Sequence, residues 1–437
     1  MNALNDHFNT TGDQRVLRLI TAGSVDDGKS TLIGRLLYDS KGVYADQLRA
    51  LETSRYRRSP DEDINLAMLT DGLEAEREQG ITIDVAYRYF STPQRKFIVA
   101  DAPGHEQYTR NMVTGASTAD AAIILVDAAK APDGKLLVQT RRHSTIARLL
   151  GVRHIVLAIN KLDLLDWSAE VYQRIVDAYA DLAQRIGIER FQAIPVSALK
   201  GDNIVHRSLH MPWYEGPTLL EHLESLDAGA SHEQGPLRVA VQWVMRHNGH
   251  QRDDFRAYAG QVFSGSISLG DAITVQPSGV SATVKSLLVH GLEVQQVQAG
   301  SPVTIVLNEM VDVSRGDWIT HREDQPAIGN VFDADVCWLD TRPLNVARKY
   351  LIKHGARTSS ARVRQVHTRR DLQQLLELAA PEPVLETNDI GRITIQTRDA
   401  LPFDPYDVLV AGGAFILIDE ASNQTVAGGM LRSVAQD

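Results

Sequence analysis

The sequence predicts an α/β domain with a mainly parallel, doubly wound sheet, followed by two antiparallel β-barrel domains. In the first half, nearly continuous apolar runs alternate with helix-like segments, which is typical of strands buried on both faces of a parallel sheet. From about Pro236 onward the apolar runs are short and alternating, and glycine and proline turns separate them. Between the halves, residues 227–235 are small and polar, which indicates a linker.

The expected elements follow this division along the chain. In the first half the predicted strands are residues 16–22, 97–100, 121–126, 154–159 and 191–196, and the helical patterns cover residues 31–38 and 168–186. In the second half the β runs form two series, residues 237–244, 258–263, 273–276 and 303–307, then residues 335–339, 362–366, 390–396 and 415–418. A second boundary near residue 329 gives three expected domains, at residues 1–230, 236–328 and 330–437.

Composition limits the class of protein. The only cysteine is Cys337, which excludes an intramolecular disulfide and a Cys-rich zinc cluster and favours a reducing, cytoplasmic location. No apolar run reaches about 18 residues and the polar N-terminus lacks the features of a secretory signal, so a membrane span is not expected. A formal net charge of −10 argues against a protein that coats nucleic acid.

A phosphate-binding loop is predicted at residues 23–30, where Gly-Ser-Val-Asp-Asp-Gly-Lys-Ser fits the pattern G-x-x-x-x-G-K-[ST]. The alternative is an ordinary glycine-rich turn, but the motif follows a predicted strand and precedes a helix, as a phosphate loop requires. Lys29 is expected to neutralise the β- and γ-phosphates, and the Ser30 hydroxyl to bind Mg²⁺. The nucleotide contacts expected here are Gly23, Ser24, Val25, Asp26, Asp27, Gly28, Lys29, Ser30 and Thr31.

A γ-phosphate sensor is predicted after the second apolar run, at Asp101, Ala102, Pro103 and Gly104. Asp101 would hold the Mg²⁺ shell and the Gly104 N–H would contact the γ-phosphate, so both contacts would exist only while the third phosphate is present. Thr82 is the candidate for a second hydroxyl ligand of Mg²⁺, and residues 39–80 are expected to rearrange with the nucleotide.

His105 directly follows this sensor and is the candidate for orienting the attacking water. The alternatives are a surface-loop histidine at this position and a plain strand threonine at Thr82. The predicted catalytic set is His105, Lys29 and Thr82, and the predicted metal set is Ser30, Thr82 and Asp101.

Selection of the base is assigned to Asn160, Lys161, Leu162 and Asp163, which follow the fourth predicted strand. The Asp163 carboxylate can accept hydrogen bonds from guanine N1–H and the exocyclic amine, and adenine offers neither donor there. Ser197 and Ala198, after the next strand, would offer a backbone N–H to the guanine carbonyl. Together with the phosphate loop, these residues predict GTP rather than ATP.

Two further clusters receive structural interpretations. Residues 141–143, Arg-Arg-His, are expected on a helix with a solvated face. Trp213 and Tyr214 are expected to pack rather than to bind a ligand.

With these motifs the chain resembles the translational GTPases of the elongation factor Tu type, and within them the GTPase subunits of bacterial sulfate adenylyltransferases. The similar strings are residues 26–31, 71–84, 104–112, 139–143, 211–214 and 255–260. At Asp27, tRNA-delivering factors usually have histidine.

The resemblance implies a GTPase domain and two β-barrels. It also implies GTP and Mg²⁺ as cofactors, and a smaller partner subunit that binds ATP and sulfate. GTP hydrolysis would then drive the formation of adenosine 5′-phosphosulfate and pyrophosphate by that subunit, in a heterodimer or a higher assembly. The alternatives are a translation factor that delivers RNA to the ribosome and a GTP-binding scaffold with little turnover.

Overall fold

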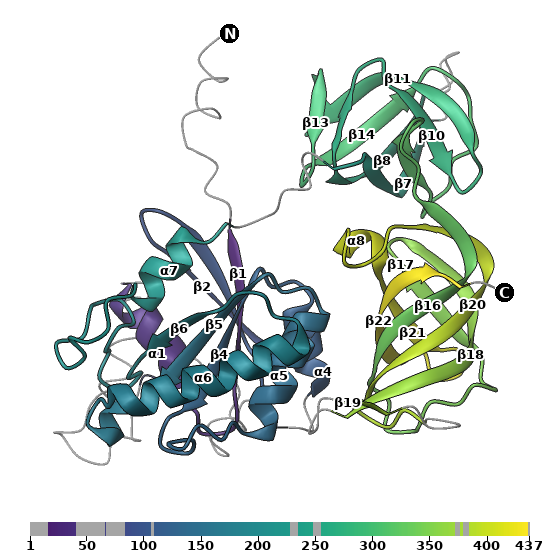
Figure 1. Ribbon diagram of the computed structural model, residues 1–437. Helices are drawn as coiled ribbons and strands as arrows, with labels where there is room; N and C mark the ends of the chain where they lie inside the picture. The colour runs from purple at the N-terminus through teal and green to yellow at the C-terminus, as the bar shows by residue number, and fades with distance from the viewer. Residues whose placement is uncertain are drawn as a thin grey trace, which may run out of the picture. The chain divides into compact units, whose positions relative to one another are not determined.

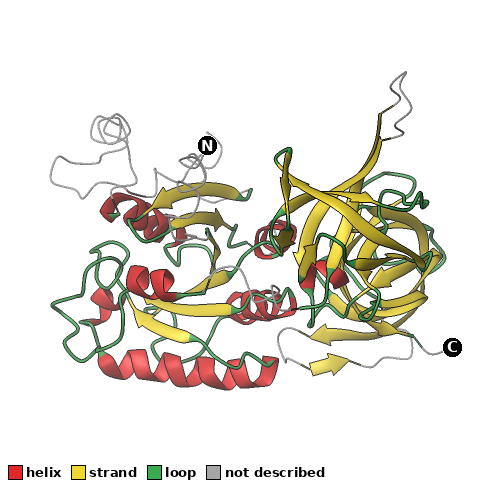
Figure 2. Ribbon diagram, turned by 90° about the horizontal axis from the view of Figure 1, so that it is seen from above, coloured by secondary structure: helices red, strands yellow, loops and turns green. Residues whose placement is uncertain are grey.

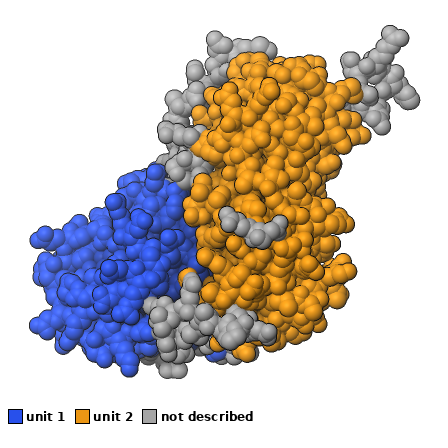
Figure 3. Space-filling view, turned by 45° about the vertical axis from the view of Figure 1, so that its right-hand side comes forward, with its two compact units in different colours: residues 1–229, 372–375 blue, residues 230–371, 376–437 orange. Residues whose placement is uncertain are grey.

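The computed structural model describes residues 16–40, 66, 84–105, 109–227, 235–247, 255–371, 376–378 and 384–435. The chain forms two compact units, residues 1–229 with 372–375 and residues 230–371 with 376–437 (Figure 3). Each unit is described below by itself. Thr82, and most of the connection at residues 39–80, lie outside the described residues.

The first unit contains a six-stranded sheet in the order β2-β3-β1-β4-β5-β6, in which only β2 is antiparallel. Its strands are β1 (Leu17–Ala22), β2 (Ala86–Ser91), β3 (Lys96–Asp101), β4 (Ala121–Asp127), β5 (His154–Asn160) and β6 (Gln192–Pro195). All seven residues of β4 are buried, because helices cover both faces of the sheet (Figures 1 and 2). The predicted α/β sheet is therefore confirmed.

Helices pack on the two faces of this sheet in two groups. They are α1 (Lys29–Asp39), α4 (Thr109–Ala116), α5 (Val138–Leu149), α6 (Ala169–Ile186) and α7 (Leu219–Ser225). Leucines of α1 and α7 share one core cluster with side chains of β1, β3 and β4, whereas α4 packs on β1 and α5, and α5 packs on β4 and α6. Ser168 caps α6 by accepting the Val171 N–H, and Gly187 ends it with φ 77°.

Two closed six-stranded antiparallel barrels make up the second unit. The first runs β10-β15-β7-β8-β14-β11 and closes through β10–β11. Its strands are β7 (Arg238–His247), β8 (Phe255–Ser264), β10 (Ala272–Gln276), β11 (Val280–Val289), β14 (Pro302–Leu307) and β15 (Trp318–His321). The short strand β12 (Leu292–Val294) extends β11, and β9 (Ser266–Ser268) pairs with β13 (Gln296–Gln298).

The second barrel runs β17-β21-β22-β16-β20-β18 and closes through β17–β18. Its strands are β16 (Ala327–Trp338), β17 (Tyr350–His354), β18 (Arg357–Asp371), β20 (Ile390–Phe403), β21 (Ala414–Asp419) and β22 (Thr425–Val434). β19 (Leu376–Leu378) extends β18, and the short helix α8 (Val410–Gly413) precedes β21. Each barrel encloses its own cluster of buried aliphatic and aromatic side chains.

Several barrel strands are longer than their apolar runs. The apolar pattern predicts a strand at residues 390–396, whereas β20 continues to Phe403 through the exposed Arg398 and the polar Asp399. Main-chain pairing holds such residues in the strand whatever their polarity, so the apolar pattern shows only the core-facing part. The domain limits at residues 230, 236, 328 and 330 remain a prediction.

Candidate nucleotide site

The predicted phosphate loop, residues 23–28 between the two elements, connects the end of β1 to the first turn of α1. Gly28 has φ 94°, a left-handed conformation that glycine adopts without strain. The Lys29 ammonium lies inside the loop and donates to the carbonyl oxygens of Gly23, at 3.1 Å, and Ser24, at 2.9 Å. Burial lowers the pKa of Lys29, and the nearby carboxylates of Asp101 and Asp27 oppose that effect.

Close approach makes two glycines of the site necessary. A Cβ atom at Gly28 would lie 2.5 Å from Asn160 Nδ2, and one at Gly104 would lie 2.5 Å from Lys29 Nζ. The backbones of the phosphate loop and of the predicted sensor therefore meet the polar groups of the other motifs without an intervening side chain. Residues far apart in the sequence converge at one edge of the sheet, as expected for the carboxyl ends of its strands.

The Asp101 carboxylate at the end of β3 is buried and lies between two hydroxyl groups. Its Oδ1 accepts from Thr21 Oγ1 at 3.0 Å, and its Oδ2 lies 3.4 Å from Ser30 Oγ. A hydroxyl and a carboxylate at this separation are a donor set that suits Mg²⁺. Thr82, the other predicted hydroxyl ligand, lies outside the described residues, and the described residues hold no group of three or more His, Cys, Asp or Glu that could bind a metal.

Asn160 connects the two ends of the predicted nucleotide site. Its Nδ2 donates to the Asp27 carbonyl at 2.8 Å, and its Oδ1 accepts the Ala198 N–H at 2.9 Å. That Ala198 N–H therefore has a partner within the protein, and its contact with guanine stays a prediction. Ser197, beside it, is buried, and its Oγ accepts the Lys200 N–H at 3.2 Å.

The predicted base-reading segment, residues 160–163, continues into the 3-10 helix η3 (Leu162–Leu165). Lys161, with φ 64°, donates to the Asp26 carbonyl of the phosphate loop. Leu162 is buried and anchors the turn, whereas Asp163 is half-buried. The Asp163 carboxylate accepts no hydrogen bond from any residue that the structure describes, so it can accept one from a ligand.

The remaining predicted residues lie in the same region. Ala102 and Pro103 join Asp101 to Gly104, and Val25, Asp26 and Thr31 belong to the phosphate loop and the first turn of α1. His105 follows Gly104 and its side chain is exposed. The part assigned to His105 in orienting water stays a prediction.

Comparison with known proteins agrees with this geometry. The family model of the elongation factor Tu GTP binding domain matches residues 14–233, and the GTP-eEF1A C-terminal domain-like model matches residues 331–432. Sulfate adenylyltransferase subunit 1 of Aliarcobacter butzleri is 44% identical over 436 residues, which cover 99% of this chain and 90% of that protein. The chain belongs to this subunit 1 family of elongation factor Tu type GTPases.

Two longer relatives have a similar sequence identity to this chain. The bifunctional enzyme NodQ of Rhizobium sp. is 47% identical over 98% of this chain, and the bifunctional enzyme CysN/CysC of Mycobacterium tuberculosis is 47% identical over 96%. The chain spans 65% of the NodQ protein and 68% of the CysN/CysC protein. The chain is a member of the subunit 1 family, and its first domain is a GTP-binding domain.

Two charged residues at the nucleotide site of this chain are not identified by the sequence motifs. Asp127, at the end of β4, accepts from Lys161 Nζ at 2.8 Å, and Lys130 donates to Asp27 Oδ1 at 3.1 Å and to the Val25 carbonyl at 2.8 Å. Asp27 Oδ2 in turn accepts the Ser24 N–H at 2.6 Å. The signal for Asp127 was present, because it is a polar residue at the end of a buried strand, but Lys130 lies in a turn without a motif.

The cluster at residues 141–143 does lie on a helix, α5, but the expectation of a solvated face was wrong for His143. This side chain is buried, and its Nδ1 has no partner among the described residues. Burial, with the positive charges of Lys29 and Arg142, lowers the pKa of His143 to about 3. The reason is position, because α5 turns this face of the helix toward the sheet.

The expected packing of Trp213 and Tyr214 is confirmed. Both rings lie against Tyr172 of α6, at centroid distances of 5.2 and 6.1 Å. The Trp213 indole also donates to the Trp167 carbonyl at 3.1 Å. Within the described residues, no helix is long and apolar enough to cross a membrane.

Proposed function

We propose that this chain is the GTP-hydrolysing subunit of a sulfate adenylyltransferase. In this proposal GTP hydrolysis drives a partner, the smaller subunit that binds ATP and sulfate, to form adenosine 5′-phosphosulfate and pyrophosphate. The observation that carries the proposal is the 44% identity to sulfate adenylyltransferase subunit 1 over nearly the whole chain. The meeting of three nucleotide motifs at one edge of the sheet supports it.

The phosphate end of the site is assigned from charge and donor chemistry. Lys29 would neutralise the β- and γ-phosphates, and the Gly104 N–H, beside Lys29, would contact the γ-phosphate. Ser30, Thr82 and Asp101 would hold Mg²⁺, which supplies positive charge between the same phosphates. The separation of Ser30 Oγ from Asp101 fits such an ion.

The base end is assigned to Asp163, Asn160 and Lys161. The Asp163 carboxylate would accept the two guanine donors, and the aliphatic stem of Lys161 would lie along the ring face. Asn160 would position the base by fixing the phosphate loop and the Ser197–Ala198 turn to each other, through its contacts with Asp27 and Ala198. His105 would orient the water that attacks the γ-phosphate.

A cytoplasmic location completes the proposal. Cys337 is the only cysteine of the sequence, so the chain has no intramolecular disulfide that an oxidising compartment would have to maintain. GTP, ATP and a second subunit would all be available there.

Pyrophosphate release tests the coupling directly. The purified chain is mixed with the small subunit, ATP and sulfate, and release is measured with GTP, with a non-hydrolysable GTP analogue and with no added nucleotide. We expect GTP to increase the rate and the analogue not to sustain it. In His105→Ala the increase should disappear while GTP affinity stays nearly unchanged.

The alternative, an RNA-delivering translation factor, predicts a different result. If GTP has no effect on pyrophosphate release, the sulfate-activation proposal is wrong. A salt-sensitive shift of aminoacyl-tRNA by the GTP form would then support the alternative.

A further inference from the structure

The second barrel contains a pocket that the proposed GTPase function does not use. It has a volume of about 740 Å³, and most of its lining comes from the connection at residues 339–349 and from strands β17 and β18. This volume is within the roughly 300–1,000 Å³ range of small-molecule sites in proteins. Three arginines, Arg342, Arg348 and Arg364, contribute to its lining, together with the aspartates Asp340 and Asp419.

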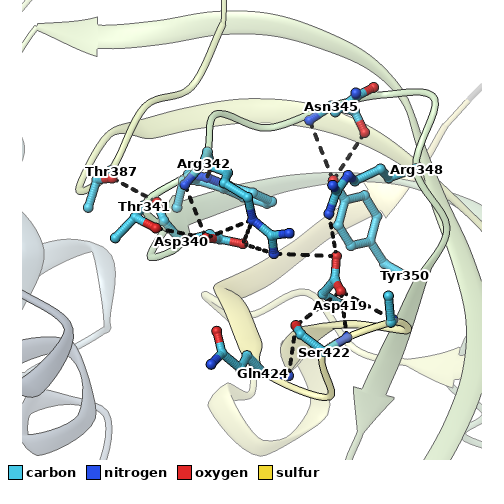
Figure 4. A network of polar contacts seen from close by, with 12 residues as sticks. Asp340, Thr341, Arg342, Asn345, Arg348, Tyr350, Thr387, Asp419, Ser422 and Gln424 are labelled. Atoms are coloured by element: carbon cyan, nitrogen blue, oxygen red, sulfur yellow. Dashed lines mark hydrogen bonds and ion pairs between the residues drawn. The ribbon is translucent and has the colours of Figure 1, made fainter.

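Both aspartates are buried and already have hydrogen-bond donors (Figure 4). Asp340 Oδ2 accepts from Arg342 Nη2 at 2.7 Å and from Arg342 Nε at 3.2 Å. Asp419 Oδ2 accepts from Arg348 Nη1 at 2.9 Å, and its Oδ1 accepts from the N–H groups of Ala421 and Ser422. The carboxylates therefore hold the two guanidinium groups in place and have little capacity left for a ligand.

The polar groups that remain available are donors. Four side-chain nitrogens have no hydrogen-bond partner within the described residues: Arg342 Nη1, Arg348 Nε and Nη2, and Asn345 Nδ2. The Asn345 Oδ1, by contrast, already accepts the Ala347 N–H at 2.8 Å. The three arginines of the lining outnumber its two aspartates, and the side-chain groups left without a partner are donors. A bound group should therefore be rich in acceptors and negatively charged.

The connection that carries these donors is fixed to the barrel at several points. The Trp338 indole donates to the Arg342 carbonyl at 2.7 Å, and the Tyr350 hydroxyl donates to the Asn345 carbonyl at 3.0 Å. Thr387 Oγ1 also donates to the Asp340 carbonyl at 2.7 Å. A ligand would meet an arrangement that needs little ordering on binding.

We propose that this pocket binds a small ligand through an oxyanion group, a phosphate, sulfate or carboxylate, held by Arg342, Arg348 and Asn345. Planar guanidinium groups fixed by carboxylates on one edge present their other N–H groups to such an oxyanion in bidentate geometry. The reduced pKa of Asp340, caused mainly by its hydrogen bonds from Arg342, keeps that carboxylate ionised at neutral pH.

Calorimetric titration of the full chain tests the site. The protein is first saturated with GDP and Mg²⁺, so that the phosphate loop is filled and cannot bind the probes. Inorganic phosphate, sulfate and succinate are then titrated separately at constant ionic strength, which distinguishes phosphate-type, sulfate-type and carboxylate ligands. We expect at least one of them to bind with a dissociation constant in the low-millimolar range or below.

Two variants locate any binding that is observed. Arg348→Gln removes one guanidinium while Asp419 keeps its donors from residues 421–422, and Asn345→Asp replaces the amide donor with a negative charge of the same shape. Each variant should weaken binding at least about tenfold. An unchanged far-ultraviolet circular dichroism spectrum would show that the variant is still folded. The control is Arg398→Gln, an exposed arginine outside the pocket, which should bind as the wild type does.

The proposal is overturned if none of the three probes binds, or if the control weakens binding as much as the two pocket variants do. Binding that is unchanged in both pocket variants overturns it as well. None of these results depends on whether the chain drives sulfate activation, because the small subunit, ATP and GTP hydrolysis are absent from the experiment.

Discussion

At the scale of single residues, Asp163 is the group on which our proposal for guanine recognition depends. Lys161 in its left-handed conformation and the buried Leu162 fix the turn, and the carboxylate of Asp163 is left with no partner among the described residues. A base that donates two hydrogen bonds can satisfy that carboxylate, and each bond to a charged group contributes about 1.5–3 kcal/mol.

Asp163→Asn should therefore change the base preference of the site from guanine to xanthine. The amide places a donor against guanine's donors, so GTP affinity should fall by about 10²-fold or more. Xanthosine triphosphate, which has a carbonyl in place of the exocyclic amine, should gain affinity. Competition with a fluorescent guanine nucleotide measures both values, and the exposed Asp166→Asn serves as the control. Equal GTP binding by both variants would show that the base is read elsewhere.

His143 gives the GTPase domain a predicted sensitivity to acid. Its pKa is lowered to about 3 in the folded protein from an ordinary value of 6.5, so between these values the unfolded chain binds the proton more readily. The free energy of unfolding that the neutral His143 contributes is thus lost as the pH falls below about 6.5, at about 1.4 kcal/mol per pH unit. From pH 7 to pH 5 this is a loss of about 2 kcal/mol.

His143→Leu should reduce that pH dependence by the same amount. The test is urea unfolding at pH 7 and pH 5, followed by hydrogen exchange of the β4 and α5 peptides, so that this unit is observed separately. Comparing the two pH values within each protein cancels the constant packing change at the substituted site. A variant that loses as much stability in acid as the wild type would contradict the prediction.

At the scale of elements, a chain of charges links the end of β4 to the phosphate loop. Lys130, from the turn after β4, pairs with Asp27, whose side chain is fully buried, and Asp127 pairs with Lys161 of the base-reading segment. Burial raises the pKa of Asp27, and the Lys130 ammonium opposes that effect. Removing Lys130 would leave the buried carboxylate with the Ser24 N–H as its remaining hydrogen-bond donor among the described residues.

The Asp27–Lys130 pair should therefore control how tightly the loop holds nucleotide. Lys130→Met should weaken GDP binding by about 10- to 100-fold, measured as the dissociation rate of a fluorescent GDP, because an unpaired buried charge destabilises the loop. The double variant with Asp27→Asn should lose less than the sum of the single changes. Lys135→Met, on the exposed turn nearby, is the control. Strictly additive effects would show that the pair does not act as a unit.

At the scale of the whole molecule, buried polar contacts join the two barrels into one compact unit. Arg238, at the start of β7, donates from Nε and Nη2 to the Asp404 carboxylate of the second barrel, at 2.8 and 2.9 Å. Arg357 bonds to Asp317 at 3.0 Å across the same boundary, and the rings of Trp318 and His354 lie 5.6 Å apart. These contacts hold the barrels in one arrangement.

Breaking the buried pair should loosen the barrels from each other. Arg238→Met leaves the Asp404 carboxylate without its guanidinium and should lower the free energy of unfolding of this unit by about 3–5 kcal/mol. Adding Asp404→Leu should restore part of the loss, because no charge then remains unpaired. Thermal unfolding of the full chain measures both, with the exposed Arg398→Ala expected to change stability by less than about 1 kcal/mol. A small effect of Arg238→Met would mean that this ion pair between the two barrels contributes little to stability.

The fold class and the nucleotide motifs could be predicted from the amino-acid sequence alone. Strands that are buried on both faces of a parallel sheet have continuous apolar sequences. A phosphate loop requires Gly28 and Lys29 at fixed spacing. Both patterns involve residues that are close in the sequence, so they can be recognised without the structure. Only the folded structure revealed four features: the contacts of Lys130, the burial of His143, the Arg238–Asp404 pair and the pocket lined by Arg342 and Arg348. Each depends on groups that are distant in sequence and adjacent in space, and no periodicity or spacing in the chain records that adjacency.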